Sequence, residues 1–429
     1  MTTTSHRSSL LTPLLSTLMF TPLSLPACVL VTDFGETEDT DGTTTTDTDG
    51  ATSAGEPLPG DSSGADTEPA SPPATPTLMW STALEHEPEH ESYYIGMTRG
   101  ANGGIYVAGG WWNTATFQGG AMLHHYTPDG VRNMEGDVPL PTAMNFSDAC
   151  VTPQGTILAV SRHVAHPTDP SSAVFGLVEL SATGDVLHVL NEVLSEDEQD
   201  EVNNTFPRLL CDPEGHAWFV LQTWNGSHLM RFGSDGVLFD EWLGSDPTTL
   251  RHDAGTLYLA HHDESNDQIR WQRRDLDGML IDERLSHECI DAFEVRGSRI
   301  IKQFYEQAGS TVIMTDLVGN EQWQIDQIDG EALDVMAMGL DDQGQAVVTW
   351  FPRGSSSDAK LSLLGPDGGI LHTEDLPRVA PPPDESYVGV LDLAIDSDSA
   401  ITVAGVESLW APSYEGSSQR AWIARYEWL

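Results

Sequence analysis

The sequence predicts an all-β fold, because a two-part pattern of short strands and tight turns recurs seven times between about residue 77 and the C-terminus. Each copy opens on a turn and an apolar run, as in 103–108, and continues with a hairpin that turns at a glycine, as in 123–130. The last copy, 422–429, stops before its turn glycine, and a strand that matches its missing part stands at 78–84. Two hairpins make a four-stranded sheet, so these observations predict a seven-bladed β-propeller closed by an N-terminal strand.

The predicted turns follow from the small residues that open each part of the pattern. The first turns fall at Gly103, Gly155, Gly215, Gly255, Gly297, Gly344 and Ser399, and the second at Gly130, Gly184, Gly236, Gly278, Gly319 and Gly368. Glycine adopts the positive φ that tight hairpin turns need, and Pro or Asp before it favours the turn. The flanking runs are rich in β-branched, aromatic and leucine side chains and have strand length. Two β-sandwiches are the alternative fold, but they do not explain the truncated last copy.

The N-terminus predicts export and lipid anchoring. Residues 1–27 combine Arg7 with a modestly apolar stretch that is too short and too rich in Pro and Thr to span a membrane. It ends in Leu25-Pro26-Ala27-Cys28, which resembles the lipobox of bacterial lipoproteins, although Pro26 departs from that pattern. The resemblance implies that Cys28 is lipidated and becomes the mature N-terminus, attached to the membrane. The alternative is an ordinary secretory signal with an incidental cysteine.

Residues 28–76 are expected to form a disordered acidic tether. The part from 33 to 76 has no Lys or Arg and is dominated by Thr, Asp, Gly, Ser, Ala and Pro, so it cannot bury a core. Its Asp-Gly repeats suggest calcium, but an EF-hand loop with Gly42 at its sixth position would have Thr48 where the bidentate acid belongs. The tether is similar to the linkers of surface lipoproteins, and residues 77–429 remain as the folded domain.

The net charge limits the possible partners. The chain has 66 Asp and Glu against 19 Lys and Arg, for a formal charge of −47 at pH 7. Such a surface repels phosphate, so we expect no nucleic-acid partner, and we expect a monomer. With 39% apolar residues, the repeat region can still bury a continuous core.

Two motifs match catalytic patterns but lack the structural context that those patterns need. His86-Glu87-Pro88-Glu89-His90 matches the zinc-protease pattern, which places both histidines on one helix face, and Pro88 would break that helix. Residues 60–64 match the nucleophile pattern of hydrolases, but they lie in the tether and not at a strand-to-helix turn. We therefore assign no catalytic residue, no metal and no cofactor.

The cysteines leave two interpretations. Besides Cys28, the chain has Cys150, Cys211 and Cys289, so an odd number remains and at least one is unpaired. Cys150 and Cys211 fall at similar places in neighbouring copies, so a disulfide between them is one interpretation in an oxidising compartment. We favour the other, in which they are buried thiols that act as small hydrophobic side chains.

The expected ligand site follows from the strand order of a propeller. The tight turns inside the hairpins lie on one face, and the connections between hairpins and between blades lie on the other, which we call the long-loop face. Exposed tryptophan suits sugar stacking or a protein contact. We expect a ligand to bind the long-loop face through Trp111, Trp112, Trp224 and Trp410. The alternative for each ring is that it caps a blade.

A propeller-type glycan hydrolase or lyase, with its site at the channel mouth, is the rival function. Such an enzyme needs acids or histidines that converge at the mouth of the central channel. The candidates are Asp263 and Glu306, beside His261 and His262.

The repeat region resembles secreted bacterial lipoproteins that contain a seven-bladed β-propeller. The resemblance rests on the repeated glycine turn with its apolar run and on the Pro-Asp-Gly turn, as at 128–130 and 366–368. It carries over no catalytic residue. It implies a membrane-anchored, extracytoplasmic binding or scaffolding module, at the cell surface or outer membrane, whose partner is an unknown surface protein or glycan.

Overall fold

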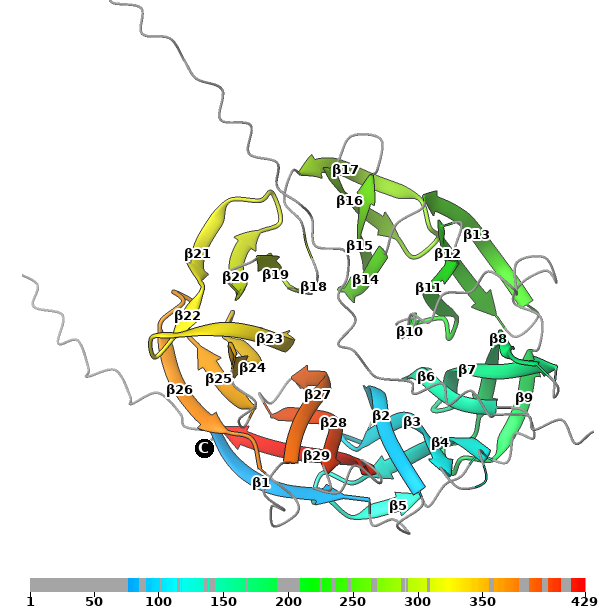
Figure 1. Cartoon of the computed structure of the whole chain (residues 1–429). Coiled ribbons are helices and arrows are strands. Elements are labelled where there is room, and N and C mark those ends of the chain that lie inside the picture. Colours follow the sequence, from blue (N-terminus) through cyan, green and yellow to red (C-terminus); the bar gives the residue numbers. More distant parts are fainter. Residues whose placement is uncertain are drawn as a thin grey trace, which may run out of the picture. The chain divides into compact units, whose positions relative to one another are not determined.

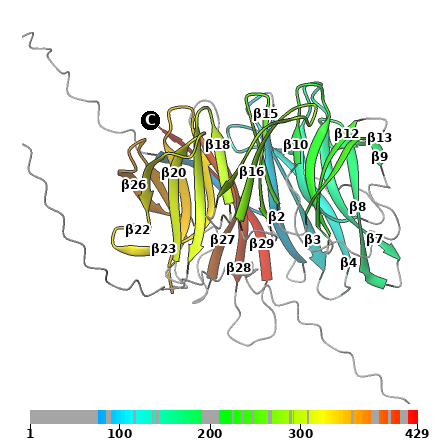
Figure 2. The ribbon, with the colours of Figure 1, turned by 90° about the horizontal axis from the view of Figure 1, so that it is seen from above.

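The computed structural model describes a series of stretches that all belong to one compact unit, residues 59–429. These are residues 76–84, 90–100, 102–113, 116, 118–134, 138, 143–166, 169–190, 209–223, 226–233, 236–244, 248–263, 268–286, 290, 292–306, 309–354, 359–377, 386–395, 400–409 and 418–428. Every regular element among them is a β-strand, which confirms the predicted all-β class. Figure 1 shows the sheets arranged around a common centre, and Figure 2 shows their strands running between two faces.

Five four-stranded sheets and one nine-stranded sheet contain these strands. The first three are β2 (His90–Arg99), β3 (Ile105–Asn113), β4 (Gln118–Tyr126) and β5 (Arg132–Met134); β6 (Ala143–Val151), β7 (Ile157–His166), β8 (Asp169–Leu180) and β9 (Val186–Leu190); and β10 (Leu209–Cys211), β11 (Ala217–Thr223), β12 (Gly226–Gly233) and β13 (Gly236–Gly244). The other two are β14 (Thr248–Asp253), β15 (Thr256–Asp263), β16 (Gln268–Asp275) and β17 (Leu280–Ser286); and β27 (Ser386–Ile395), β28 (Ile401–Leu409), β29 (Ser418–Trp428) and β1 (Pro76–Ala83).

The nine-stranded sheet consists of two four-stranded sets and a short extra strand. Its strands are β18 (Ala292–Arg296), β19 (Arg299–Glu306), β20 (Gly309–Asp316), β21 (Glu321–Ile325), β22 (Gln327–Ile328), β23 (Glu331–Leu340), β24 (Ala346–Pro352), β25 (Lys360–Leu364) and β26 (Ile370–Asp375). One residue pair, Ser310 with Leu333, joins β20 to β23 and so links the two sets. The strand β22 forms a hairpin with the start of β23 and buries Ile328 between the sets.

The N-terminal strand β1 pairs antiparallel with the C-terminal strand β29, from Pro76 opposite Trp428 to Ala83 opposite Trp422. Its register matches that of β26 on β25, with a bulge at the same place in both strands. Leu84 donates its backbone N–H to Ala421 at 2.9 Å, as Leu376 does to Ala359 at 2.7 Å. Leu84 therefore holds the position after β1 that Leu376 holds after β26.

The turn glycines have the backbone conformation that the sequence predicts. All twelve glycines of the two predicted sets have positive φ, for example +80° at Gly130 and +84° at Gly278. A side chain three residues before the glycine fixes many of these turns from within. At Asp275 one carboxylate oxygen accepts the N–H groups of Asp277 and Met279, at 3.0 and 2.9 Å. This arrangement satisfies backbone donors that no strand partner reaches.

Seven hydrophobic clusters make up the core of the described residues, and each lies between two neighbouring four-stranded units of the ring. Tyr106 and Leu123, for example, pack on Phe146 and Val178 between the sheets that begin with β2 and β6. One cluster lies between the two sets of the nine-stranded sheet. Another joins the sheet of β1 to the sheet of β2, with Ile423 against Val107. Each sheet buries both faces against its neighbours, as the blades of a propeller do.

Side chains also join neighbouring four-stranded units, which are the five separate sheets and the two sets of the nine-stranded sheet, through hydrogen bonds to the turns. In four joints a donor from one unit reaches the carbonyl two residues before the turn glycine of the next unit. These bonds are Trp80 Nε1 to Pro128 O at 2.8 Å, Tyr106 Oη to Ala182 O at 3.4 Å, Arg284 Nη1 to Leu317 O at 3.2 Å, and Trp323 Nε1 to Pro366 O at 3.1 Å. The rings of Trp80 and Trp323 also cover Gly130 and Gly368, where an added Cβ would lie 2.6 and 2.8 Å from the indole.

The two cysteines that the sequence left open form a disulfide. Cys150 in β6 and Cys211 in β10 are bonded with an S–S distance of 2.04 Å and a Cα–Cα distance of 5.5 Å. Our preference for two buried thiols was therefore wrong. Equivalent positions in consecutive sheets lie side by side in the ring, which brings the two Cβ atoms within bonding range. Cys289 lies outside the described residues.

Candidate functional site

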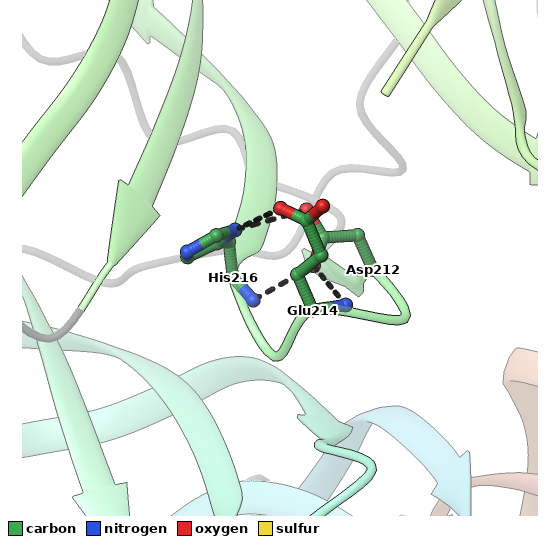
Figure 3. A group of neighbouring side chains, drawn as sticks. All are labelled: Asp212, Glu214 and His216. Carbon is green, nitrogen blue, oxygen red and sulfur yellow. Dashed lines mark hydrogen bonds and ion pairs between the residues drawn. The ribbon is translucent and has the colours of Figure 1, made fainter. Parts of the chain in front are cut away.

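The turn between β10 and β11 brings three possible metal-binding side chains together. Ligand atoms of Asp212, Glu214 and His216 all lie within 4.8 Å of one another (Figure 3). Asp212 Oδ1 accepts the backbone N–H groups of Glu214 and His216, both at 2.9 Å, and this bonding shapes the turn. The carboxylates and the imidazole are groups that bind divalent metals, so the cluster has to be tested against its surroundings.

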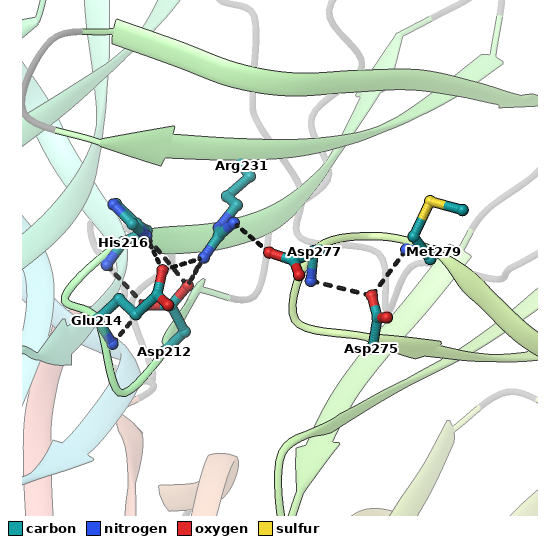
Figure 4. A network of polar contacts seen from close by, with 7 residues as sticks. All are labelled: Asp212, Glu214, His216, Arg231, Asp275, Asp277 and Met279. Carbon is teal, nitrogen blue, oxygen red and sulfur yellow. Dashed lines mark hydrogen bonds and ion pairs between the residues drawn. The ribbon is translucent and has the colours of Figure 1, made fainter.

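A guanidinium already occupies the centre of this cluster. Arg231 donates from Nε and Nη2 to Asp212 Oδ2, at 3.1 and 2.7 Å, and from Nη2 to Glu214 Oε2 at 3.0 Å (Figure 4). Its Nη1 also lies 3.5 Å from Asp277 in the next sheet. Because Arg231 supplies the positive charge that a metal would supply, the cluster is an ion-pair joint between two sheets.

Titration of Asp212 reflects this pairing. Burial raises the pKa of the Asp212 carboxyl, but the hydrogen bonds from the His216 N–H and from Arg231 outweigh it, so the pKa is lowered overall. Asp341 holds the same place in its own turn and accepts the N–H groups of Gln343 and Gln345. There burial outweighs the N–H bonds, and the pKa of Asp341 is raised. The two aspartates differ because an arginine contacts Asp212.

Sequence reasoning missed this group of turn residues. It noted the Asp or Pro that stands before some of the turn glycines, whereas the side chain that accepts the turn N–H groups stands three residues before the glycine. Three residues before the glycine stand Asp212, Asp275, Asp316 and Asp341. Ser181 holds the same position in its own turn and also accepts two N–H groups. The available signal was an Asp or Ser three residues before a turn glycine.

The structure does not bring the predicted tryptophans into one described cluster. Trp111, in β3, is half-buried and packs against the core cluster that includes Ala421 and Tyr94. An added Cβ on Gly120 would lie 2.6 Å from Trp111 Nε1, so this ring covers the neighbouring strand. The backbone of Trp112 lies in β3, but its side chain, Trp224 and Trp410 lie outside the described part.

Connections on the long-loop face vary in length. Thr223 pairs with Gly226, so only two residues close the hairpin between β11 and β12. Between β28 and β29 the last pair is Leu409 with Ser418, which leaves room for a longer loop. The described strand ends therefore give this face both short and long connections.

The candidate catalytic cluster of the rival function is described only in part. His261 is buried at 4% exposure and pairs in the backbone with Thr248 and Arg270. The side chains of His262, Asp263 and Glu306 lie outside the described part. His86 and Cys28 lie outside it as well. His261 therefore lies in the interior of the sheet and not at an open surface.

One small cavity lies between the sheets of β6 and β10. Its volume is about 60 Å³, and Leu158, Glu179, His188 and Phe232 are among the residues that line it. A cavity of this size holds a few water molecules and is far below the size of a small-molecule site. Within the described residues, no helix has the length and apolar character to cross a bilayer.

Comparisons with known proteins identify the fold and not the family. No protein-family model and no curated protein matches the chain. Among solved structures, virginiamycin B lyase from Staphylococcus aureus is similar, with 12% identity, a TM-score of 0.50, and coverage of 83% of this chain and 100% of that chain. The β-propeller domain of the Trilobed protease from Pyrococcus furiosus has 10% identity, a TM-score of 0.47, and coverage of 77% and 93%. BamB from Moraxella catarrhalis has 10% identity, a TM-score of 0.43, and coverage of 83% and 98%.

At such low identity these similarities transfer no residue roles. The four-stranded antiparallel sheets, arranged radially with a hydrophobic cluster between each pair, are those of a β-propeller. The described part of the chain is therefore a β-propeller domain.

The contrast between Asp212 and Asp341 gives a testable prediction. The lowered pKa of Asp212 means that its ionised form stabilises the fold above the unfolded pKa of about 3.9, and that this stability is lost as the pH falls through the lower folded value. Asp212→Asn should lower the free energy of unfolding at pH 7 by about 1.5–3 kcal/mol, as for a hydrogen bond to a charged group. The difference from wild type should shrink below pH 4 in urea titrations.

Asp341→Asn is the matched control. The raised pKa of Asp341 means that its ionisation costs stability as the pH rises above the unfolded value. Asparagine keeps the acceptor oxygen, so the variant should be as stable as wild type at pH 7, or more stable. An equal loss of stability in both variants would show that the contact with Arg231 is not the cause of the difference between Asp212 and Asp341.

Proposed function

We propose that this protein is a lipid-anchored, extracytoplasmic binding or scaffolding module, in which a seven-bladed propeller presents a glycan- or protein-binding surface on its long-loop face. Counting the nine-stranded sheet as two blades makes seven blades of the six sheets. The seven core clusters, one for each pair of neighbouring blades, support this count. The pairing of β1 with β29 supports closure by the N-terminal strand.

Closure makes the stability of the ring depend on β1. Deletion of residues 76–84 removes Trp80 and Leu84 together with their contacts. It leaves the last blade with three strands and an open edge. The loss should be several kcal/mol, at about 1.5–3 kcal/mol for each large apolar side chain that loses its contacts. The midpoint of thermal unfolding measures it. Deletion of residues 33–72 is the control and should change the midpoint little; equal midpoints for both deletions would refute closure.

The direction of β1 indicates on which face the chain enters the domain. Pro76 pairs with Trp428, the last described residue of β29. Leu78 holds the position in β1 that Ile370 holds in β26 directly after its tight turn. The chain before Pro76 therefore joins the domain on the face of the tight turns. The long-loop face, on which we propose that the ligand binds, is therefore opposite to the face on which the chain enters the domain.

Cys28→Ala tests the anchor. The thiol is the site of lipid attachment in the proposed mature protein, so the variant should move from the membrane fraction to the soluble fraction after cell fractionation. Its melting midpoint, measured on purified protein, should equal that of wild type. Cys289→Ala is the matched control and should stay in the membrane fraction. If Cys28→Ala also stays with the membrane, the proposed anchor is wrong.

Binding on the long-loop face is proposed to involve Trp111, Trp112, Trp224 and Trp410. Once a glycan array and a cell-surface pull-down with the full chain have supplied a ligand, alanine at each position should weaken binding by about 1–3 kcal/mol. Calorimetric titration measures this. Asp129→Ala, in an exposed tight turn on the opposite face, should leave the affinity unchanged. Unfolding of the tryptophan variants without a specific binding defect would show that the rings cap blades.

A further inference from the structure

One tryptophan that the sequence did not single out is exposed on the rim of the domain. Trp242 in β13 has 61% of its surface exposed, and it is the only strongly exposed aromatic side chain among those that the structure describes. Other tryptophans of the same fold, such as Trp218, Trp350 and Trp422, are fully buried. A large aromatic ring that is exposed to solvent on an edge strand lacks the burial that usually stabilises such a side chain. Its environment therefore shows what kind of molecule the ring could contact.

The residue opposite Trp242 and the residue two positions before it are polar. His228 stands directly opposite Trp242 in the register of β12 and β13. Asp240, two residues before Trp242, points to the same side, and its Oδ1 lies 3.1 Å from His228 Nδ1. The Asp240 side chain is 48% exposed, and that of His228 is 17% exposed. The ring thus lies beside a carboxylate that is held in position and remains open to solvent.

The opposite side of β13 is already occupied. Glu241 accepts a two-pronged ion pair from Arg274 of the next sheet, with both distances at 2.7 Å. Phe239 covers Gly278 in the turn of that sheet. Because these contacts fix the strand from one side, Trp242 and Asp240 are presented on a rigid backbone.

We propose that Trp242, Asp240 and His228 form a stacking site for a neutral saccharide chain, an inference that rests on the proposed binding function and names the class of its ligand. A pyranose ring offers a face of C–H groups to an indole and hydroxyl groups at its edge to a carboxylate and an imidazole. A protein contact centred on one tryptophan would instead need a surrounding apolar patch that excludes water. The residues next to the ring on its side of the sheet, His228 and Asp240, are polar, and the exposed Leu238 lies beyond Asp240 at the tight-turn end of the strand. With a net charge of −47, the chain repels acidic saccharides and so selects neutral ones.

The site lies toward the long-loop face. Gly244, the last residue of β13, pairs with Ser227, and β12 begins at Gly226 directly after the Trp224-Asn225 connection. Trp224, one of the residues proposed for ligand binding, is therefore close in sequence to the strand end beside Trp242. A saccharide chain bound along this rim could extend toward that connection.

The test is calorimetric titration of the full chain with neutral hexasaccharides of glucose, mannose and galactose. At least one should bind, and Trp242→Ala should weaken it about tenfold or more, the loss of about 1.4 kcal/mol. Trp242→Phe, which keeps a smaller ring, should lie between wild type and alanine. Asp240→Ala should weaken binding about fivefold through the lost hydroxyl contacts. Leu285→Ala, at a similarly exposed residue of the edge strand β17, is the matched control and should bind as wild type does.

Each outcome decides between the two proposals. Wild-type affinity in Trp242→Ala overturns the saccharide site, and so does a lack of binding to every hexasaccharide. If alanine variants of Trp224 and Trp410 lose a ligand that Trp242→Ala keeps, the binding function stands and this site fails. If Trp242→Ala alone loses the saccharide, this site stands and the contribution of the other tryptophans fails. Equal unfolding midpoints for wild type and Trp242→Ala confirm that the variant is folded.

Discussion

The contact between neighbouring sheets is the constraint on which the rest of this structure depends. A four-stranded sheet cannot bury its two faces alone, so each blade becomes stable only when two neighbours cover it. The clusters between blades supply the apolar burial, and a side-chain donor that reaches the next turn sets the position of one blade against another. In the joint between the last blade and the first, Trp80 supplies that donor, with its Nε1 2.8 Å from the carbonyl oxygen of Pro128. A strand from the N-terminus thus uses the same joint as strands from the middle of the chain.

Several of the scarce positive charges of this acidic protein lie at these joints. Arg251 pairs with Glu294 at 2.5 Å, Arg274 with Glu241 at 2.7 Å, and Arg296 with Asp342 at 2.5 Å. The first two pairs connect residues of different sheets, and the third connects the two four-stranded sets of the nine-stranded sheet. Arg231 belongs to the same pattern, which explains why a cluster with the composition of a metal site contains a guanidinium. With 19 basic residues against 66 acids, placing arginines between blades offsets repulsion where the sheets approach most closely.

The division of the domain into two faces connects the fold to the proposed function. Tight turns on one face are closed by their own Asp and Ser side chains, so their backbone groups are largely satisfied within the turn. The chain enters the domain on that face at Pro76. The other face carries the connections of varied length, and the rim near it carries Trp242, whose ring is 61% exposed. In the proposed function, the chain enters the domain on one face and the ligand binds at the other.

The sequence by itself determined what depends on local chemistry. Glycine spacing predicted the turns at the twelve glycines of the two sets, because positive φ is a property of single residues, but it missed the turn at Gly330 between β22 and β23. The truncated last copy pointed to a matching strand at 78–84, and the structure has β1 there, paired with β29. Only the tertiary structure decided which side chains meet. The disulfide of Cys150 and Cys211 forms because adjacent blades place equivalent strand positions within reach, and a spacing of 61 residues does not reveal that contact. Trp218 is buried and Trp242 exposed within one sheet, because burial depends on which strand lies at the rim.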